Sequence, residues 1–236
     1  MKSKKVILLS FIFLVMSGSL HAENKLMISA IKGSINTLIS ADVMTEAYRR
    51  IGVEIAVEEY PAKRALFFAN EGKVDGELFR IADMEIEYPN LIRVPVVINH
   101  LDAMVYTKSA NFTLNGWASL KPYKIGIRRG VKFSERGTRG MDTVAVNSNK
   151  ALFEILDAGK VDIIVISRTN GLAISNKFKK TDIKLLEAPI ESYPMYHYLH
   201  SKNKHLLLRL QTALQAMEKE GLIKKIRTRF LSELIL

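Results

Sequence analysis

From residue 25 onward, the apolar residues follow two alternating patterns. Short apolar runs, which predict strands, alternate with stretches in which apolar residues recur at the 3.6-residue spacing of a half-buried helix. Gly52 suits the end of one helix, and Pro61 suits the first turn of the next. The first half is therefore predicted to contain strands over 26–31 and 53–57, helices over 40–50 and 62–70, and a third strand ending near residue 80. This order is typical of an open parallel sheet, whose ligands bind at the carboxyl ends of the strands.

The second half repeats this alternation. An apolar stretch over 91–108 predicts strands that lead out of the first unit and cross to a second one. After it we expect strands over 123–127, 143–146 and 161–166, an extended return segment over 195–199, and helices over 150–158, 170–178, 204–220 and 222–230. The last of these helices is expected to pack back on the first unit.

A short phrase occurs twice in equivalent places. Gly72-Lys-Val-Asp75 and Gly159-Lys-Val-Asp162 each follow a predicted helix and precede an apolar strand. Glycine at the end of a helix and a strand directly after it are the second half of a parallel α/β unit. The recurrence therefore predicts two similar α/β lobes with a cleft between them.

The first 22 residues have the pattern of a secretory signal peptide. Three lysines precede an apolar run over 6–16, and Ser17-Gly-Ser-Leu-His-Ala22 follows, after which we expect cleavage within a few residues of Ala22. A run of 11 residues is short for a bilayer span, so an uncleaved anchor is the less favoured alternative. The chain has no cysteine, which excludes disulfides and a lipid anchor on cysteine. These features predict a soluble, monomeric protein of the periplasm, with true secretion as the alternative.

Charge and motifs argue against several functional classes. The net charge is +11, but Lys and Arg are spread along the chain among Asp and Glu, so no nucleic-acid partner is predicted. His197 and His200 would face opposite sides of an extended segment, which disfavours a shared metal ion. No nucleotide-binding loop, nucleophile elbow or paired catalytic carboxylate is evident. We therefore predict neither a metal nor another cofactor, and no enzymatic activity.

Several segments, taken in order, resemble a known family. These are the signal peptide, the two Gly-Lys-Val-Asp phrases and three further segments: Tyr60-Pro-Ala-Lys-Arg64-Ala-Leu, Lys124-Ile-Gly-Ile-Arg128-Arg-Gly130 and Glu218-Lys-Glu-Gly221-Leu-Ile-Lys-Lys-Ile. Together they resemble the periplasmic solute-binding proteins of polar-amino-acid ABC importers. The resemblance implies an α/β type 2 periplasmic-binding-protein fold with two lobes, each a mixed, mostly parallel sheet flanked by helices, and with two hinge strands. It places lobe 1 over 23–108 plus 194–236 and lobe 2 over 109–193.

The resemblance also implies a function. A small anionic or amino-acid-like solute would be held as the lobes close and would then be delivered to a membrane-embedded ABC permease, without covalent chemistry. A ligand-sensing module for a signalling partner is the alternative, since it would use the same closure. A dehydratase-like enzyme, with Glu77 and Asp83 as acid and base, is a weaker alternative, because fold does not dictate function.

Two arginines are the main candidates for holding an anion. The family usually holds the ligand carboxylate with an arginine of the first lobe, and Arg80 follows the strand that Asp75 begins. Arg128 stands in the turn after the first strand of the second lobe, where a basic or polar contact is common. Each guanidinium offers forked donors to a carboxylate. We expect the loss of Arg80 to weaken binding most. Further candidates lie near the same strand ends: Tyr60 for stacking on the ligand, Arg64, Ser29 and Ser34.

Ser167 is the informative departure from the family pattern. Receptors of α-amino acids commonly carry an Asp at this place, which pairs with the ligand ammonium. A hydroxyl does not replace a buried anion as the partner of a full positive charge. Either another acid takes that role, with Glu77 the nearest candidate, or the ligand has no α-amino group.

Overall fold

The structure, a computed structural model, describes residues 25–175, 178 and 182–235. The predicted signal peptide and its cleavage site lie outside the described residues. Within the described ranges, no helix combines the length and the apolar composition that a bilayer span requires.

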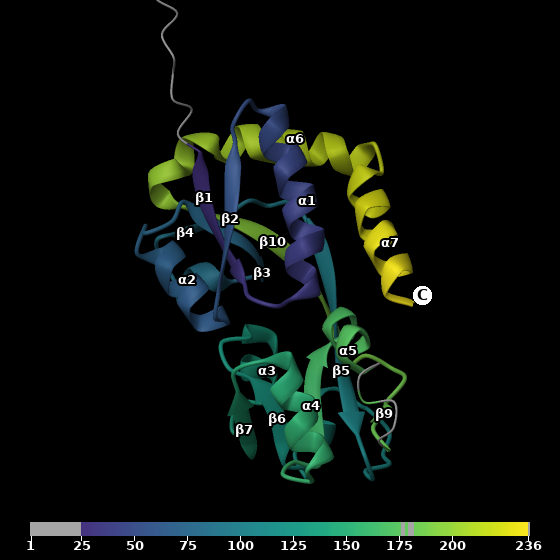
Figure 1. Cartoon of the computed structure of the whole chain (residues 1–236). Helices are drawn as coiled ribbons and strands as arrows, with labels where there is room; N and C mark the ends of the chain where they lie inside the picture. Colours follow the sequence, from purple (N-terminus) through teal and green to yellow (C-terminus); the bar gives the residue numbers. More distant parts are fainter. Residues whose placement is uncertain (1–24, 176–177, 179–181, 236) are drawn as a thin grey trace, which may run out of the picture.

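The main chain forms two α/β lobes (Figure 1). The strands are β1 (Leu26–Ile31), β2 (Ile55–Tyr60), β3 (Gly76–Ile81), β4 (Leu91–Arg93), β5 (Asn99–Thr107), β6 (Ile125–Arg128), β7 (Thr143–Val146), β8 (Ile163–Ser167), β9 (Lys184–Leu185) and β10 (Glu191–His200). The helices are α1 (Ile35–Arg50), α2 (Ala62–Asn70), α3 (Lys132–Gly137), α4 (Asn149–Asp157), α5 (Arg168–Ser175), α6 (Leu207–Lys219) and α7 (Leu222–Ile235). Short 3-10 helices lie at η1 (Met84–Ile86), η2 (Trp117–Leu120) and η4 (Ser201–Leu206).

The strands follow the order β2-β1-β3-β10-β5-β8-β6-β7. β1 is parallel to β2 and β3 in the first lobe, and β6 is parallel to β7 and β8 in the second. Between them run β5 and β10, which are antiparallel to their neighbours. Residues 99–103 of β5 pair with β10, and residues 103–107 pair with β8. The two long strands therefore pass from one lobe to the other, as Figure 1 shows for β5, and form the hinge of the two-lobed fold.

The predicted elements differ from the observed ones mainly at their ends, but the helix α3 and the short strand β9 were not predicted. The second strand begins two residues later than predicted, because the N–H of Val53 bonds to the carbonyl of Tyr48 and keeps this residue in the turn that closes α1. α1 begins at Ile35 rather than near residue 40. α7 contacts α1 and α6, as expected of a helix packed on the first lobe, but it also contacts α5 of the second lobe.

The two Gly-Lys-Val-Asp phrases adopt the same structure. Gly72 and Gly159 both have positive φ, at 66° and 65°, and each ends a helix. Asp75 accepts a hydrogen bond from the N–H of Met27 at 2.8 Å, and Asp162 accepts one from the N–H of Lys124 at 2.7 Å. In both lobes this carboxylate accepts a hydrogen bond from the backbone at the start of the lobe's first strand. The repeated phrase therefore has the same structural role in each lobe.

The larger apolar core extends from the first lobe through the hinge to β6 and β8 of the second lobe, and a smaller one surrounds α4. The larger core contains a polar pair. Tyr48 on α1 and His197 on β10 are both fully buried, and the tyrosine hydroxyl lies 2.9 Å from His197 Nε2. Burial lowers the pKa of His197 to about 4, so the imidazole is neutral at physiological pH.

Candidate ligand-binding site

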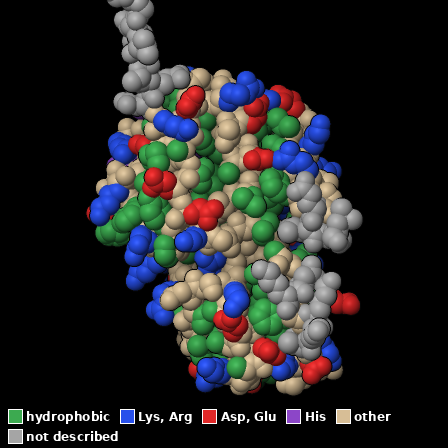
Figure 2. Space-filling view, viewed as in Figure 1, with side chains coloured by type: hydrophobic (Ala, Val, Ile, Leu, Met, Phe, Trp, Pro, Cys, Tyr) green, Lys and Arg blue, Asp and Glu red, His purple; other side chains and the backbone are tan. Residues whose placement is uncertain are grey.

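A small cavity lies between the two lobes, where the carboxyl ends of β1, β6 and β8 converge. Its volume is about 30 Å³, which is enough for a water molecule but not for an amino acid. On the face seen in Figure 2 the lobes meet at a waist, and Lys and Arg are scattered over both of them among Asp and Glu. The small volume of the cavity between the lobes shows that the lobes are closed. The lining consists of Ile31, Ser34, Asn36, Phe79, Leu101, Arg128, Val131, Phe133, Asn149, Leu152, Val165, Ile166, Ser167 and Asn170.

Arg128 carries the only charge among the lining residues. Its side chain is 6% exposed, and it donates hydrogen bonds from Nη2 to the carbonyl of Lys32 at 2.6 Å and from Nη1 to Asn149 Oδ1 at 3.3 Å. Its Nε is buried and has no hydrogen-bond partner in the described part of the chain. No ion pair involves Arg128 among the described residues. Burial lowers its pKa, the nearby charge of Arg80 adds to the effect, and the charge of Glu59 opposes it.

Arg80 has a different environment. It is also buried, but its Nε donates to Glu77 Oε1 at 2.7 Å, so its charge is neutralised inside the first lobe. Ser29 Oγ donates to the other oxygen of Glu77 at 2.5 Å. The remaining guanidinium nitrogens of Arg80 bond to the carbonyls of Ala62 and, across the cleft, Gly130. Burial raises the pKa of Glu77, whereas Arg80 and Ser29 stabilise its ionised form.

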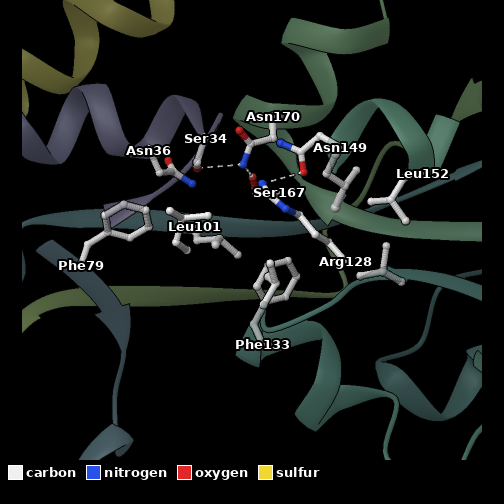
Figure 3. A pocket seen from close by; sticks show the side chains of 14 residues that line it. Ser34, Asn36, Phe79, Leu101, Arg128, Phe133, Asn149, Leu152, Ser167 and Asn170 are labelled. Atoms are coloured by element: carbon white, nitrogen blue, oxygen red, sulfur yellow. Dashed lines mark hydrogen bonds between the residues drawn. The ribbon is translucent and has the colours of Figure 1, made fainter. Parts of the chain in front are cut away.

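Amide and hydroxyl groups fill the cleft around the amino end of α1. The N–H of Ile35 donates to Asn170 Oδ1 at 2.8 Å, and Asn170 Nδ2 donates to Ser34 Oγ at 3.2 Å and to Ser167 Oγ at 2.7 Å. Figure 3 shows Asn170 between these two serines, with Arg128 and Asn149 beside it. The polar groups of the second lobe are thus bonded to the loop between β1 and α1.

A third set of contacts closes the rim of the cleft. Glu87, which follows η1 in the first lobe, lies 2.8 Å from Lys132 Nζ and 3.0 Å from Arg136 Nη2, both on α3 of the second lobe. These two cations lower the pKa of Glu87. Gly130 approaches the amino end of α2 so closely that a Cβ there would lie 2.4 Å from the backbone nitrogen of Lys63.

Comparison with known proteins decides the fold. No family model matches the chain. A protein of Shewanella oneidensis, described as uncharacterized, is 26% identical over 193 residues, which cover 78% of this chain and 73% of that protein. The structure is similar to a histidine kinase sensor domain with similarity to periplasmic binding proteins, with TM-score 0.74 and 16% identity over 89% of this chain and 96% of that chain.

Two further solved structures are binding proteins. An ancestral arginine-binding protein bound to glutamine has TM-score 0.73 and 16% identity over 89% of this chain and 99% of that chain. The substrate-binding protein of an amino acid ABC transporter has TM-score 0.70 and 15% identity over 88% of this chain and 99% of that chain. The chain has the type 2 periplasmic-binding-protein fold.

Within this fold, only part of the predicted site comes together. Arg128, Ser34 and Ser167 line the cavity. Arg80 lines a neighbouring interlobe pocket. Glu77 is its ion-pair partner, and Ser29 bonds to Glu77. The other two candidates are apart from the cavity: Tyr60 bonds to Glu58 and packs edge-on against Phe68, and Arg64 is exposed on α2. The role of each residue in binding remains a prediction.

Sequence reasoning missed the amides. Asn36, Asn149 and Asn170 each follow the carboxyl end of a strand by a few residues, which is the place where ligands of an open α/β sheet bind. That position was the available signal. The aromatic rings of Phe79 and Phe133, which also line the cavity, gave no comparable signal, because an apolar residue near a strand end is more often part of the core.

Among the described residues, no group of three or more His, Asp or Glu side chains is placed to hold a metal ion.

Proposed function

We propose that this chain is a solute-binding receptor that captures a small organic anion between its lobes. The observation that carries this proposal is Arg128, a buried cation on the interlobe cavity with a free Nε and no carboxylate partner in the described structure. The charge of Glu59 offsets part of the cost of this buried cation without bonding to it, and a bound anionic ligand would remove more of that cost. Most of the residues that line the cavity are apolar, which suits a ligand with an apolar body.

The charges around the cavity favour a ligand without an ammonium group. No Asp or Glu is among the residues that line it. Glu77, the candidate to replace the missing Asp, is fully buried and bonded to Arg80 and Ser29. Ser167 accepts a hydrogen bond from Asn170 and carries no charge. A carboxylate with an uncharged body therefore fits better than an ordinary α-amino acid.

Closure is proposed to occur about β5 and β10, with lobe 1 formed by 23–108 plus 194–236 and lobe 2 by 109–193. The lobes must separate for a solute to enter, because the cavity of about 30 Å³ is too small for it. In this proposal the protein is exported, loses its signal peptide near Ala22, and works in the periplasm as a monomer without catalysing a reaction.

Delivery to an ABC permease is the proposed next step, and an amino acid ABC transporter's substrate-binding protein among the structural neighbours supports it. A sensing role is the second candidate, because a histidine kinase sensor domain is equally similar. Permease genes beside this gene would favour delivery, and a neighbouring membrane kinase would favour sensing.

Thermal shift on residues 23–236 tests the proposal. Leucine, 4-methyl-2-oxopentanoate and 4-methylpentanoate share an apolar body and differ in the group beside the carboxylate, and similar triplets can be made for other side chains. A ligand at 100 times its Kd adds about 2.7 kcal/mol, which raises Tm by about 5–10 °C. We expect shifts with the two acids that lack the amino group. A strong preference for the amino acids would refute the argument and turn attention to Glu77.

A further inference from the structure

Polar groups of the second lobe form hydrogen bonds to the loop between β1 and α1 and to the first residues of α1. Lys32, Gly33, Ser34, Ile35 and Asn36 each bond to one of them: the partners are Arg128, Asn149, Asn170 twice and Thr169. Five consecutive residues of one lobe thus meet the polar wall of the other. This set of contacts joins the two lobes in the closed arrangement.

Two of these contacts put neutral oxygens where an anion would be favoured. α1 has 16 residues, no acidic residue in its first turn and no hydrogen bond from the side chain of its N-cap residue, Ser34. The amino end of such a helix attracts negative charge. Its N–H at Ile35 bonds instead to the amide oxygen of Asn170.

The second contact is at Arg128. Its Nη2 bonds to the carbonyl oxygen of Lys32, while its buried Nε has no partner in the described structure. The guanidinium therefore has an unused donor beside a cavity whose wall includes Ser34 and Asn36 at the start of α1. Arg128 and Asn170 lie next to each other on this wall (Figure 3).

From this arrangement we infer that the ligand's carboxylate binds between the amino end of α1 and Arg128, displacing the amide oxygen of Asn170 and the carbonyl oxygen of Lys32. In the closed structure these two oxygens lie at the inferred anion site. The ligand class is a monocarboxylate, which offers one oxygen to the N–H of Ile35 and the other to the guanidinium. This inference rests on the proposed receptor function and specifies its binding site.

Replacing Asn170 by Asp tests the anion site without a ligand. The carboxylate is nearly isosteric with the amide, can accept from the N–H of Ile35 and from the hydroxyls of Ser34 and Ser167, and brings the charge that the site lacks. We expect Asn170→Asp to raise Tm by about 2–4 °C. We also expect it to weaken binding of 4-methylpentanoate at least about tenfold, because the site is filled.

Two controls separate this effect from a general change in charge. Asn147→Asp adds the same charge to the same lobe, beside Arg129 on the exposed surface, and should leave Tm and binding near wild type. In an Arg128→Met background the gain in Tm from Asn170→Asp should disappear. A Tm for Asn170→Asp at or below that of wild type, or an equal gain without Arg128, would overturn the inference.

If Asn170→Asp does not fold, the wild-type protein still decides the matter. On titration with 4-methylpentanoate, the amide NMR resonance of Ile35 should shift far more than that of Ile125, which lies at the opposite end of β6 from Arg128. Equal shifts would contradict the site. Titration with inorganic phosphate tests whether another anion fills it, and binding of phosphate in preference to the carboxylate would overturn the ligand class. If no carboxylate binds to the wild type while Asn170→Asp still raises Tm, the receptor function fails but the anion site stands.

Discussion

Two buried arginines, Arg80 of the first lobe and Arg128 of the second, lie near the closed cleft in different surroundings. Arg80 is neutralised by Glu77 within its own lobe, whereas Arg128 has only neutral oxygens as partners in the described structure. A buried ion pair holds a structure in one arrangement, and a buried cation without an anion is a place for a charged ligand. The comparison suggests that the first arginine maintains the lobe and the second binds the solute.

Residue type and position in the sequence did not reveal this difference. Both arginines lie at the carboxyl end of a strand, Arg80 as the second-last residue of β3 and Arg128 as the last of β6, and both were candidates for the ligand carboxylate. We expected Arg80 to matter most, because the family resemblance places the carboxylate-binding arginine in the first lobe. The geometry favours the opposite order, and the variants below test it.

The largest expected effect is on stability, at Arg80. Arg80→Met leaves the carboxylate of Glu77 buried without its partner, and breaking a buried pair in this way costs about 3–5 kcal/mol. Urea unfolding at pH 7 measures the loss. The double variant Arg80→Met/Glu77→Leu removes both charges and should recover most of the stability. A loss below about 1 kcal/mol for Arg80→Met would show that the pair does not hold the lobe.

The second prediction concerns the pH dependence of the free energy of unfolding, which should depend on His197 in the core and not on Arg128 at the cavity. The pKa of His197 is about 4 in the folded protein, below its usual value of 6.5, because burial disfavours the imidazolium. Between these two values the unfolded state binds the proton more tightly, so stability falls as the pH is lowered from 6.5 to 4. The loss from this residue is about 3 kcal/mol.

Urea unfolding at pH 7 and pH 4 checks this loss. His197→Gln should flatten the dependence, whereas Arg128→Met should keep the slope of the wild type, since no carboxylate or histidine lines the cavity at Arg128. The same slope in His197→Gln and wild type would remove the histidine as its cause.

A smaller effect is expected at the contact between the lobes. Gly130 and Gly140 have nearly the same positive φ, 77° and 78°, but only at Gly130 would a Cβ meet other atoms. Both alanine variants should lose about 1–2 kcal/mol of stability from backbone strain. Gly130→Ala should in addition weaken binding of 4-methylpentanoate about tenfold, because it blocks full closure. Titration calorimetry measures the affinity of both variants for 4-methylpentanoate. Equal affinities would mean that closure does not depend on the close contact between Gly130 and Lys63.

Much of the fold was predictable from local patterns. β1, α2 and β7 have the predicted bounds, and the two Gly-Lys-Val-Asp phrases correctly indicated two α/β lobes. Apolar spacing, helix-ending glycines and Pro61 were sufficient for this, since each acts within a few residues.

The site was less predictable, because its contacts join residues far apart in the chain. Asn170 meets Ile35 across 135 positions, and Arg128 meets Lys32 across 96. Such contacts depend on how the lobes close, which no local pattern encodes. Residues three apart on a regular strand point to opposite faces, so the pairing of Glu77 with Arg80 was also not expected.

Calorimetry with 4-methyl-2-oxopentanoate and 4-methylpentanoate tests most directly whether Arg128 holds the anion. The Arg80→Met/Glu77→Leu variant provides the comparison, and Tm shows that each protein is folded. A charge-assisted hydrogen bond is worth about 1.5–3 kcal/mol, so Arg128→Met should bind these acids about 10- to 150-fold more weakly than wild type, while the double variant should stay within about threefold. Wild-type affinity in Arg128→Met together with lost binding in the double variant would contradict the account and restore Arg80 as the ligand-binding arginine.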